Sequence, residues 1–483
     1  MNHTMRTTVI LRSLTHALLA AAVLSGCAFT PAYERPTTPQ PAAFKELQGW
    51  APAAPADALE RGPWWNLFSD PVLDGLMGQV EVSNQNVAAA VAAYAQARAT
   101  VAGQRAALFP TVTLTGGANR NGSGGGSNND GNGNNNGGGR TSNSYRLNIG
   151  STWEPDVWGR LRAGVSAAQA NAQASAADLA SARLSAQGEL AADYFSLRSV
   201  DAQRALLATT IEGYQRVLKI TQNRFDVGIV PHSDVYQAQT QLASAQSDDL
   251  SLARQRAQYE HAIAVLVGKA PADFALAPVP WNVTVPDVPV GVPSALLERR
   301  PDIAAAERAV AASNAQIGIV RSAYFPQIGL TASYGPSASA IGDLFKASSM
   351  AWALGLSATE TIFNGGANRA AVQGATAARE QAVARYRQTV LTAFADVEDQ
   401  LAATRVLAQQ QDLLRVASEA ADKVEEQVLN RYKAGQVSYS EVVQAQVTAL
   451  NARRSLVQAQ GNRQTTAVAL IQSLGGGWHA GQE

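Results

Sequence analysis

Histidines and paired acids are the side chains with which this chain could carry out catalysis or bind a metal ion. The histidines beyond the N-terminal region are too scattered for the short ligand spacing of a metal site: His232, His261 and His479. The adjacent acids Asp248–Asp249 and Glu425–Glu426 point in different directions on a helix, so neither pair suits acid–base catalysis. No Gly-x-Ser-x-Gly or His-Glu-x-x-His motif occurs. The sequence therefore predicts no catalytic residue, no metal site and no enzyme.

Cys27 offers a different chemistry, because it is the only cysteine of the chain. A lone cysteine excludes an internal disulfide and a cysteine-based zinc site. Arg6, Arg12, an apolar run over 17–24 and two small residues precede it, which is the order of a secretory signal peptide. Leu24–Cys27 resembles the bacterial lipobox, in which the thiol is lipidated. We expect a signal peptide over 1–26 and a lipid on Cys27; a chance cysteine beside an ordinary cleavage site is the alternative.

The composition limits the partners that the chain can have. The 483 residues carry 38 Lys and Arg and 38 Asp and Glu, so the net charge is zero and nothing points to nucleic acid. Residues 27–69 include a Pro- and Ala-rich stretch and are expected to form a lipidated N-terminal tether. No cofactor is expected apart from the covalent lipid on Cys27.

The rest of the chain contains two copies of one unit. Arg224–Val235 recurs as Arg431–Val442 at an offset of 207 positions, and Ala107–Pro110 recurs as Ala323–Pro326. A proline-rich segment separates the two halves. The predicted organisation follows from these landmarks: a first repeat over 70–277, a linker over 278–293, a second repeat over 294–475 and a C-terminal tail over 476–483.

Each unit contains two stretches in which apolar residues alternate with small or polar ones. They predict strands over about 111–119, 145–153, 327–334 and 350–358. Their length and alternation are typical of transmembrane β-strands. Tyr145, Trp153 and Tyr334 are expected at strand ends, where they would suit an interfacial aromatic girdle. A half-buried sheet of a soluble protein produces the same alternation and is the alternative.

Four strands cannot close a membrane barrel, since the smallest have about eight. Open strand edges are excluded from lipid, so membrane strands would force the chain to oligomerise, and three chains would supply twelve strands. Between the first two strands, Asn121–Gly139 consists almost entirely of Gly, Asn and Ser. It lacks the Gly-Lys-Ser/Thr ending of a phosphate loop, so we expect a surface loop.

Two proline-free segments, Arg160–Phe225 and Gly366–Tyr432, predict helices that would reach roughly 100 Å at 1.5 Å per residue. Each is followed by a turn that contains a glycine, and Ser233 and Ser440 are the expected caps of the next helices. Small and apolar residues step by three and four along the helices, as in a coiled-coil seam. The three stripes are Val235, Ala238, Leu242, Ala245 and Leu252; Leu413, Ala417, Ala420 and Val424; and Val442, Ala445, Ala449, Ala452, Leu456 and Ala459.

Two further segments carry a family resemblance. Trp64–Leu73 and Leu296–Ile303 resemble signatures of the outer-membrane factors of tripartite, RND-type efflux systems, a TolC-like family. With the lipobox, the sequence is most similar to the lipoprotein branch of OprM and NodT type. The resemblance covers essentially the whole mature chain.

The resemblance implies a mainly α-helical fold with membrane β-strands, built from an internally duplicated helix–strand–strand–helix unit. A homotrimer would form a twelve-stranded β-barrel in the outer membrane, continued by a long α-helical barrel in the periplasm. The protein would be lipid-anchored in the bacterial outer membrane and would passively conduct small molecules, such as drugs or other toxic compounds. Its partners would be a periplasmic membrane-fusion adaptor, an inner-membrane RND-type pump and outer-membrane lipid.

The resemblance also assigns roles to the two turns. Adaptor contacts are implied at Val227, Gly228, Ile229, Ala434, Gly435 and Gln436. A polar network that closes the periplasmic entrance is implied at Asp234, Arg431, Tyr432 and Glu441. Acids near a helix start also complement the helix dipole, so capping is an equal alternative for Asp234 and Glu441. Some relatives have an acidic residue facing the pore where this chain has Gln444, which leaves the ion selectivity of the gate open.

Two other functions share parts of this pattern. A type I protein-secretion duct has the same fold and is the first alternative. A periplasmic structural or adaptor coiled-coil lipoprotein is the second, although an adaptor would have one hairpin with compact β domains rather than a duplicated unit. The lipobox and Arg300–Ile303 favour the efflux channel. The substrate is not set by the sequence, because selectivity in such systems resides largely in the pump.

Overall fold

The structure is a computed structural model, and it describes residues 30–39, 41–47, 63–123, 140–288 and 299–477. Its contacts divide the chain into two compact units. The first, here called the sheet unit, comprises 1–36, 96–173 and 308–384; the second, here called the helix unit, comprises 37–95, 174–307 and 385–483. The expected signal peptide, Cys27 and most of the expected surface loop lie outside the described residues.

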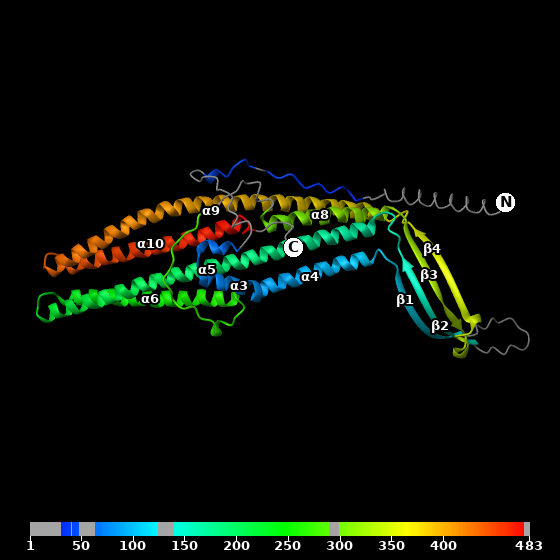
Figure 1. The fold of residues 1–483 in the computed structure, drawn as a ribbon, viewed down its shortest axis with the longest axis horizontal. Helices are drawn as coiled ribbons and strands as arrows, with labels where there is room; N and C mark the ends of the chain where they lie inside the picture. The colour runs from blue at the N-terminus through cyan, green and yellow to red at the C-terminus, as the bar shows by residue number, and fades with distance from the viewer. Residues whose placement is uncertain (1–29, 40, 48–62, 124–139, 289–298, 478–483) are drawn as a thin grey trace, which may run out of the picture. The chain divides into compact units, whose positions relative to one another are not determined.

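The sheet unit contains one antiparallel sheet in the order β1-β2-β3-β4 (Figure 1). Its strands are β1 (Thr111–Ser123), β2 (Arg140–Trp153), β3 (Gln327–Ala338) and β4 (Met350–Thr359). All four extend beyond the expected bounds, β4 by Thr359 alone. Added pairs such as Asn121 with Ser142 join through backbone groups and need no apolar side chain. Asn121–Ser123, expected in a surface loop, therefore belong to β1.

The longest helices have the same lengths in both halves of the chain. α5 (Arg160–Asp226) and α9 (Ala367–Lys433) each have 67 residues, and α6 (His232–Leu266) and α10 (Tyr439–Ser473) each have 35. All four pairs of bounds differ by the offset of 207 found in the sequence. The duplication is thus visible in the elements themselves.

Shorter helices complete the two halves. They are α3 (Pro71–Ser83), α4 (Gln85–Ala106) and α8 (Pro301–Arg321). Short 3₁₀ helices are η1 (Lys45–Leu47), η2 (Trp64–Phe68), η3 (Pro271–Asp273), η5 (Ser322–Tyr324), η6 (Ile341–Asp343) and η7 (Ala347–Ser349). Within the described ranges, no helix combines the length and the apolar character needed to cross a membrane.

The Trp64–Leu73 signature holds α3 against α5 in the helix unit. Trp64 is buried and its indole Nε1 donates to Gln187 Oε1 at 3.3 Å. One carboxylate oxygen of Asp70 accepts the Val72 N–H at 2.9 Å and so caps α3, while the other accepts the Tyr194 hydroxyl at 2.6 Å. These residues therefore fix the start of the first repeat onto its longest helix.

Two of the three expected seams are largely buried in the helix unit. The stripes on α6 and α10 include Val235, Ala238, Val442 and Ala449, all buried. The third stripe, expected on α9, is exposed: Leu413 and Val424 are 72% and 51% exposed, and Ala417 and Ala420 are exposed as well. The seam prediction is wrong there for the single chain, because α9 buries another line of residues: Val390, Val397, Leu401 and Ser418.

Candidate functional site

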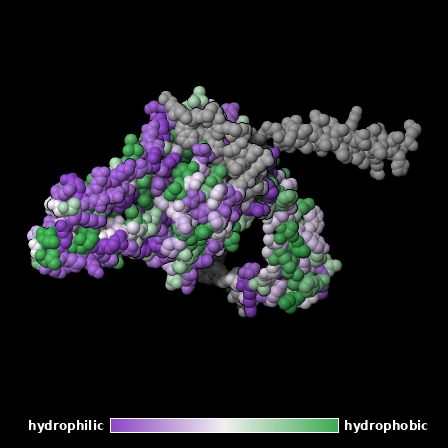
Figure 2. All heavy atoms as spheres, turned by 60° about the vertical axis from the view of Figure 1, so that its left-hand side comes forward, coloured by the Kyte–Doolittle hydropathy of each residue, from purple (hydrophilic) through white to green (hydrophobic). Residues whose placement is uncertain are grey.

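One face of the sheet is apolar from edge to edge. The register aligns Leu114 with Ile149, Ile149 with Tyr334 and Tyr334 with Trp352, so one rung carries a large apolar side chain from every strand. These four side chains are 69%, 53%, 56% and 74% exposed, in that order. Figure 2 shows hydrophobic residues gathered along the sheet. A contiguous exposed apolar surface of this kind marks contact with a membrane or with another protein.

The opposite face of the sheet is small and polar. β1 presents threonines there (Thr111, Thr113 and Thr115), and the other strands add glycine, serine, asparagine and alanine at the paired positions. In the described part of the chain, β1 pairs only with β2 and β4 only with β3. The two outer edges therefore present unpaired backbone groups, which lipid does not tolerate.

One aromatic residue of the expected girdle marks an end of the sheet. Trp153 lies at the end of β2, and its indole Nε1 donates to Leu108 O at 3.0 Å. Tyr145 and Tyr334, expected at strand ends, lie inside β2 and β3, because both strands continue through small and polar residues. Of the three expected girdle residues, only Trp153 occupies a strand end.

Each long hairpin ends in the same glycine turn. The N–H of Ile229 donates to Arg224 O at 2.8 Å, and the N–H of Gln436 donates to Arg431 O at 3.0 Å. This helix ending requires a left-handed residue, and Gly228 and Gly435 have φ values of 76° and 75°. The two tips thus share one backbone geometry.

The tips differ in their side chains. Val227 and Ile229 are 69% and 63% exposed and give the first tip an apolar surface. Ala434 and Gln436 are exposed on the second tip, which is smaller and more polar. All six residues expected to contact an adaptor lie at these tips and are exposed.

The helices after the two turns begin earlier than expected. α6 starts at His232 with Pro231 at the cap position, and α10 starts at Tyr439 with Ser438 at the cap position. Ser438 and Glu441 form a reciprocal capping box. The expected caps Ser233 and Ser440 were wrong; both lie in the first helical turn. The Ser-x-x-Glu spacing of 438–441 is the signal that identifies the true cap.

Tyr432 is the buried centre of the contact between the two tips. It is 3% exposed and lies 5.4 Å from the Tyr439 ring, between centroids. Arg224, at the end of α5, donates from a guanidinium nitrogen to Tyr432 O at 3.1 Å and places its guanidinium carbon 4.9 Å from the Tyr432 ring centroid. Val217, Ala238 and Val442 complete the cluster. Residues of both hairpins therefore meet here.

The other expected gate residues have different surroundings. Burial raises the pKa of Tyr439, and the nearby Tyr432, Tyr214 and Asp234 add to that shift. Asp234 lies in the first turn of α6. Glu441 serves the cap of α10, and Arg431 is exposed with no ion-pair partner among the described residues.

Comparison with known proteins identifies the family of this chain. The model of the family described as outer membrane efflux protein matches residues 76–269 and 292–476. The chain belongs to this family. It is an outer-membrane channel component of an efflux pump, located in the bacterial outer membrane and extending into the periplasm.

Individual relatives agree with this assignment over nearly the full chain. TtgC of Pseudomonas putida, described as a probable efflux pump outer membrane protein, is 31% identical over 473 residues, which are 97% of this chain and 96% of TtgC. Outer membrane protein OprJ of Pseudomonas aeruginosa is 29% identical over 469 residues, 96% of each chain. The solved outer-membrane channel OprN has a TM-score of 0.85 at 28% identity, covering 94% of this chain and 100% of OprN.

Arg224, which contacts Tyr432, was not among the residues expected to act at the tips. It is the repeat counterpart of Arg431, 207 positions earlier, so the duplication itself was the available signal. The family resemblance implied a role for Arg431, but Arg224 makes the contact between the hairpins in the helix unit.

The acidic pairs of the long helices have structural partners. Asp248 pairs with Arg454 at 2.8 Å, Asp249 with Arg204 at 3.0 Å and Glu425 with Arg453 at 2.8 Å. These three ion pairs therefore join neighbouring helices, and that of Asp249 ties α6 to α5. Among the described residues, no three His, Cys, Asp or Glu side chains come together as metal ligands.

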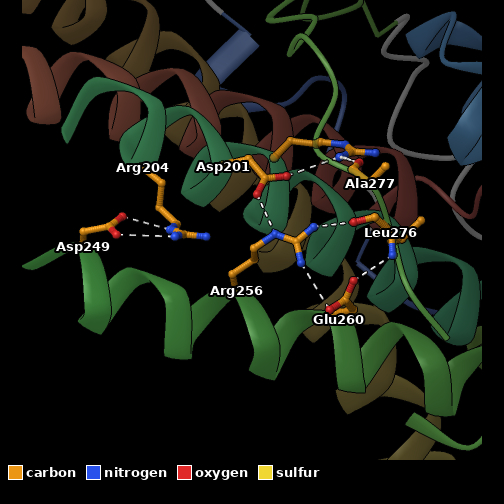
Figure 3. A network of polar contacts seen from close by, with 8 residues as sticks. Asp201, Arg204, Asp249, Arg256, Glu260, Leu276 and Ala277 are labelled. Carbon is orange, nitrogen blue, oxygen red and sulfur yellow. Dashed lines mark hydrogen bonds and ion pairs between the residues drawn. The ribbon is translucent and has the colours of Figure 1, made fainter. Parts of the chain in front are cut away.

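A polar network anchors the segment that leaves α6 (Figure 3). Asp201 on α5 accepts from Arg256 at 2.7 Å and from Arg198 at 3.3 Å. Arg256 and Arg198 also donate to the carbonyls of Leu276 and Ala277, and Glu260 accepts the Leu276 N–H at 2.7 Å. The network holds the start of the connection between the repeats onto α5 and α6.

Proposed function

We propose that three copies of this efflux protein close their sheets into one twelve-stranded barrel that spans the outer membrane. The observation that supports this is the sheet itself, with a contiguous exposed apolar face and two unpaired outer edges. Because β1 and β4 run antiparallel, β4 of one copy can continue the same pattern onto β1 of the next. The apolar face then contacts lipid and the polar face lines the lumen.

We propose that the long helices of the three copies form the periplasmic continuation of the channel. The exposed stripe of α9 (Leu413, Ala417, Ala420 and Val424) supports this, because it has coiled-coil spacing and is not covered within the chain. A helix of a neighbouring copy would cover it and complete the α-helical barrel.

The partners follow from the tips. A periplasmic adaptor binds the exposed Val227, Gly228 and Ile229 of one tip and Ala434, Gly435 and Gln436 of the other, and an inner-membrane RND-type pump supplies the energy. The channel itself makes and breaks no bond, needs no cofactor and lets solute diffuse through. Relatives named for toluene, antibiotic and pyoverdine transport support small molecules as the cargo.

The entrance is closed at the tips, where Asp234, Arg431, Tyr432 and Glu441 were expected to act. The contact of Arg224 with Tyr432 is the best candidate for the link that must break on opening. Glu441 acts in this scheme by fixing the start of α10, next to the cluster.

The lipid on Cys27 remains part of the proposal. Residues that follow it along the tether pack on α9 in the helix unit, where the carboxylate of Glu398 accepts the N–H groups of Lys45 and Glu46 at 2.7 and 2.9 Å. Such docking suits a chain that returns from the membrane along the outside of the helices.

Gel electrophoresis of outer membranes tests the oligomer. Detergent-extracted protein, unheated and heated, is run beside Cys27→Ser. We expect a heat-sensitive trimer for the wild type, with a mass loss that corresponds to the lipid in the heated variant. A protein that is a monomer or dimer in the soluble periplasmic fraction would contradict the barrel and favour the coiled-coil alternative. Secretion of a protein substrate with a cognate ABC exporter would favour the type I duct.

A further inference from the structure

The polar face of the sheet carries two basic residues, both on β2, and no acidic residue among the described strand positions. Counting along each strand from the register, this face consists of Thr, Gly and Asn on β1, Ser, Asn, Gly and Thr on β2, Gln, Gly, Thr and Ser on β3, and Ala, Gly, Ser and Thr on β4. The exceptions are Arg146 and, at the first position of β2 opposite Ser123, Arg140, whose side chain is outside those that the structure describes. Because no acid lies on this face, its net charge is positive, and Arg146 is the cation that lies well inside its strand.

The register shows that nothing on this face neutralises Arg146. Its neighbours across the two ladders are Gly117 on β1 and Ser337 on β3, which have no charge. None of the described strand residues is acidic. Arg146 is exposed and has no ion-pair partner among the described residues, so its guanidinium group faces the space in front of the polar face.

We propose that Arg146 sets the charge preference of the channel in favour of anions. The inference rests on the proposed closure of three sheets, which would place three copies of Arg146 in one ring around the lumen. Lipid behind the strands has a low dielectric constant, so the field of the ring is directed into the aqueous lumen. Anionic and neutral solutes then pass the ring more easily than cationic ones.

Two features let a ring of Arg146 side chains influence which ions pass. The rung of Arg146 lies next to the rung of Leu147 and Gly116, within the apolar band that would contact lipid, so solute cannot bypass it. At an ionic strength of about 0.1 M the screening length is about 10 Å, so the charge reaches well into the lumen. The effect should therefore grow as salt is diluted.

The test is the reversal potential of purified trimers in planar bilayers under a KCl gradient. Wild type is compared with Arg146→Gln, Arg146→Glu and Arg120→Gln. Arg120 is the matched control, because it lies on the same strand pair with Asn143 as its partner but belongs to the opposite, apolar-face series. Unheated gel mobility checks that each variant forms the trimer.

We expect Arg146→Gln to lower the ratio of chloride to potassium permeability about two-fold at about 0.1 M salt, by screened Coulomb attraction to three charges. Arg146→Glu should lower it about four-fold, since the charge changes by twice as much, and Arg120→Gln should leave it unchanged.

The outcomes separate the two proposals. Trimers that conduct with the same reversal potential in wild type and Arg146→Gln would refute the role of Arg146 and leave the barrel intact. An equal shift in Arg120→Gln would refute it too, since the effect would not depend on the face. A wild-type protein that runs as a monomer without heating and gives no current would refute the barrel itself, and the ring with it.

Discussion

Arg224 links the two hairpin tips through one hydrogen bond and one stacked contact, both to Tyr432. Replacing Arg224 with Ala removes both, at a cost to the closed state of about 1–2 kcal/mol. We expect the tips to part more often, so that bilayer conductance rises and cells become more sensitive to a large hydrophilic antibiotic. Single-channel recording and growth inhibition measure these effects.

Arg431→Ala is the matched comparison for Arg224→Ala. Arg431 occupies the equivalent repeat position but is exposed and has no ion-pair partner among the described residues. A larger opening effect from Arg431→Ala than from Arg224→Ala would contradict the structure-based assignment. That result would instead support Arg431 as the gate residue, as the family resemblance implies.

Asp193 gives the helix unit a pH dependence. Burial, with a smaller contribution from the charge of Glu189, raises the pKa of Asp193 from 3.8 to about 6. A raised pKa means that the folded state binds the proton of the Asp193 carboxyl more tightly than the unfolded state does. This proton binding therefore stabilises the fold at low pH, and the stabilisation is lost as pH rises through 6. The free energy of unfolding of Asp193→Asn should therefore match that of the wild type near pH 4. Above pH 6 it should be higher by about 1 kcal/mol, after allowance for partial exposure of Asp193.

Thermal unfolding followed by circular dichroism at several pH values measures this difference. Glu189→Gln should reproduce only a small part of the gain, because the charge of Glu189 is the lesser cause. An advantage of Asp193→Asn that is equally large at pH 4 and pH 7 would exclude titration of Asp193 as its origin.

At the scale of elements, glycine decides how closely α10 approaches α5. A Cβ atom added to Gly461 would lie 2.8 Å from Ser199 Oγ and 2.9 Å from Ser199 Cβ. Gly461→Val should therefore destabilise the helix unit by about 1–3 kcal/mol through overpacking. Thermal melts of the purified protein provide the measurement.

Gly213 on α5 is the control for that substitution. A Cβ added there meets nothing within 4 Å, so Gly213→Ala should stabilise the helix by about 1 kcal/mol. If both substitutions lower the melting temperature equally, loss of glycine in general, rather than the close approach at Gly461, is responsible.

The elements were predictable to the extent that their patterns are local. The two proline-free helices and their offset of 207 appear in the structure as α5 and α9, since a repeated sequence folds into a repeated element. The ends of β1 and β2 were not predictable from alternation, because Asn121–Ser123 and residues 140–144 pair through the backbone alone. The tip contact was also missed, since the meeting of Arg224 with Tyr432, 208 positions apart, depends on tertiary packing.

At the scale of the whole molecule, the barrel requires that the two faces of the sheet meet different solvents. Ala353 and Leu354 are adjacent on β4 and point to opposite faces, as their register partners Ser333 and Ala332 show. Leu354→Arg puts a charge on the face that would contact lipid, which costs about 2–4 kcal/mol near the bilayer midplane. Ala353→Arg puts the same charge on the face that would line the aqueous lumen.

We therefore expect Leu354→Arg to reduce the amount of heat-sensitive trimer in outer membranes strongly, while Ala353→Arg assembles close to the wild-type level. Because the two variants add the same side chain at neighbouring positions, their difference isolates the direction in which each residue points. Quantitative blotting of unheated membrane fractions measures it. Equal assembly of both variants would mean that the apolar face does not contact lipid, and the reverse order would place the lumen on the apolar side. If only Leu354→Arg loses the trimer, the alternation of side chains along β4 is required for insertion in the membrane.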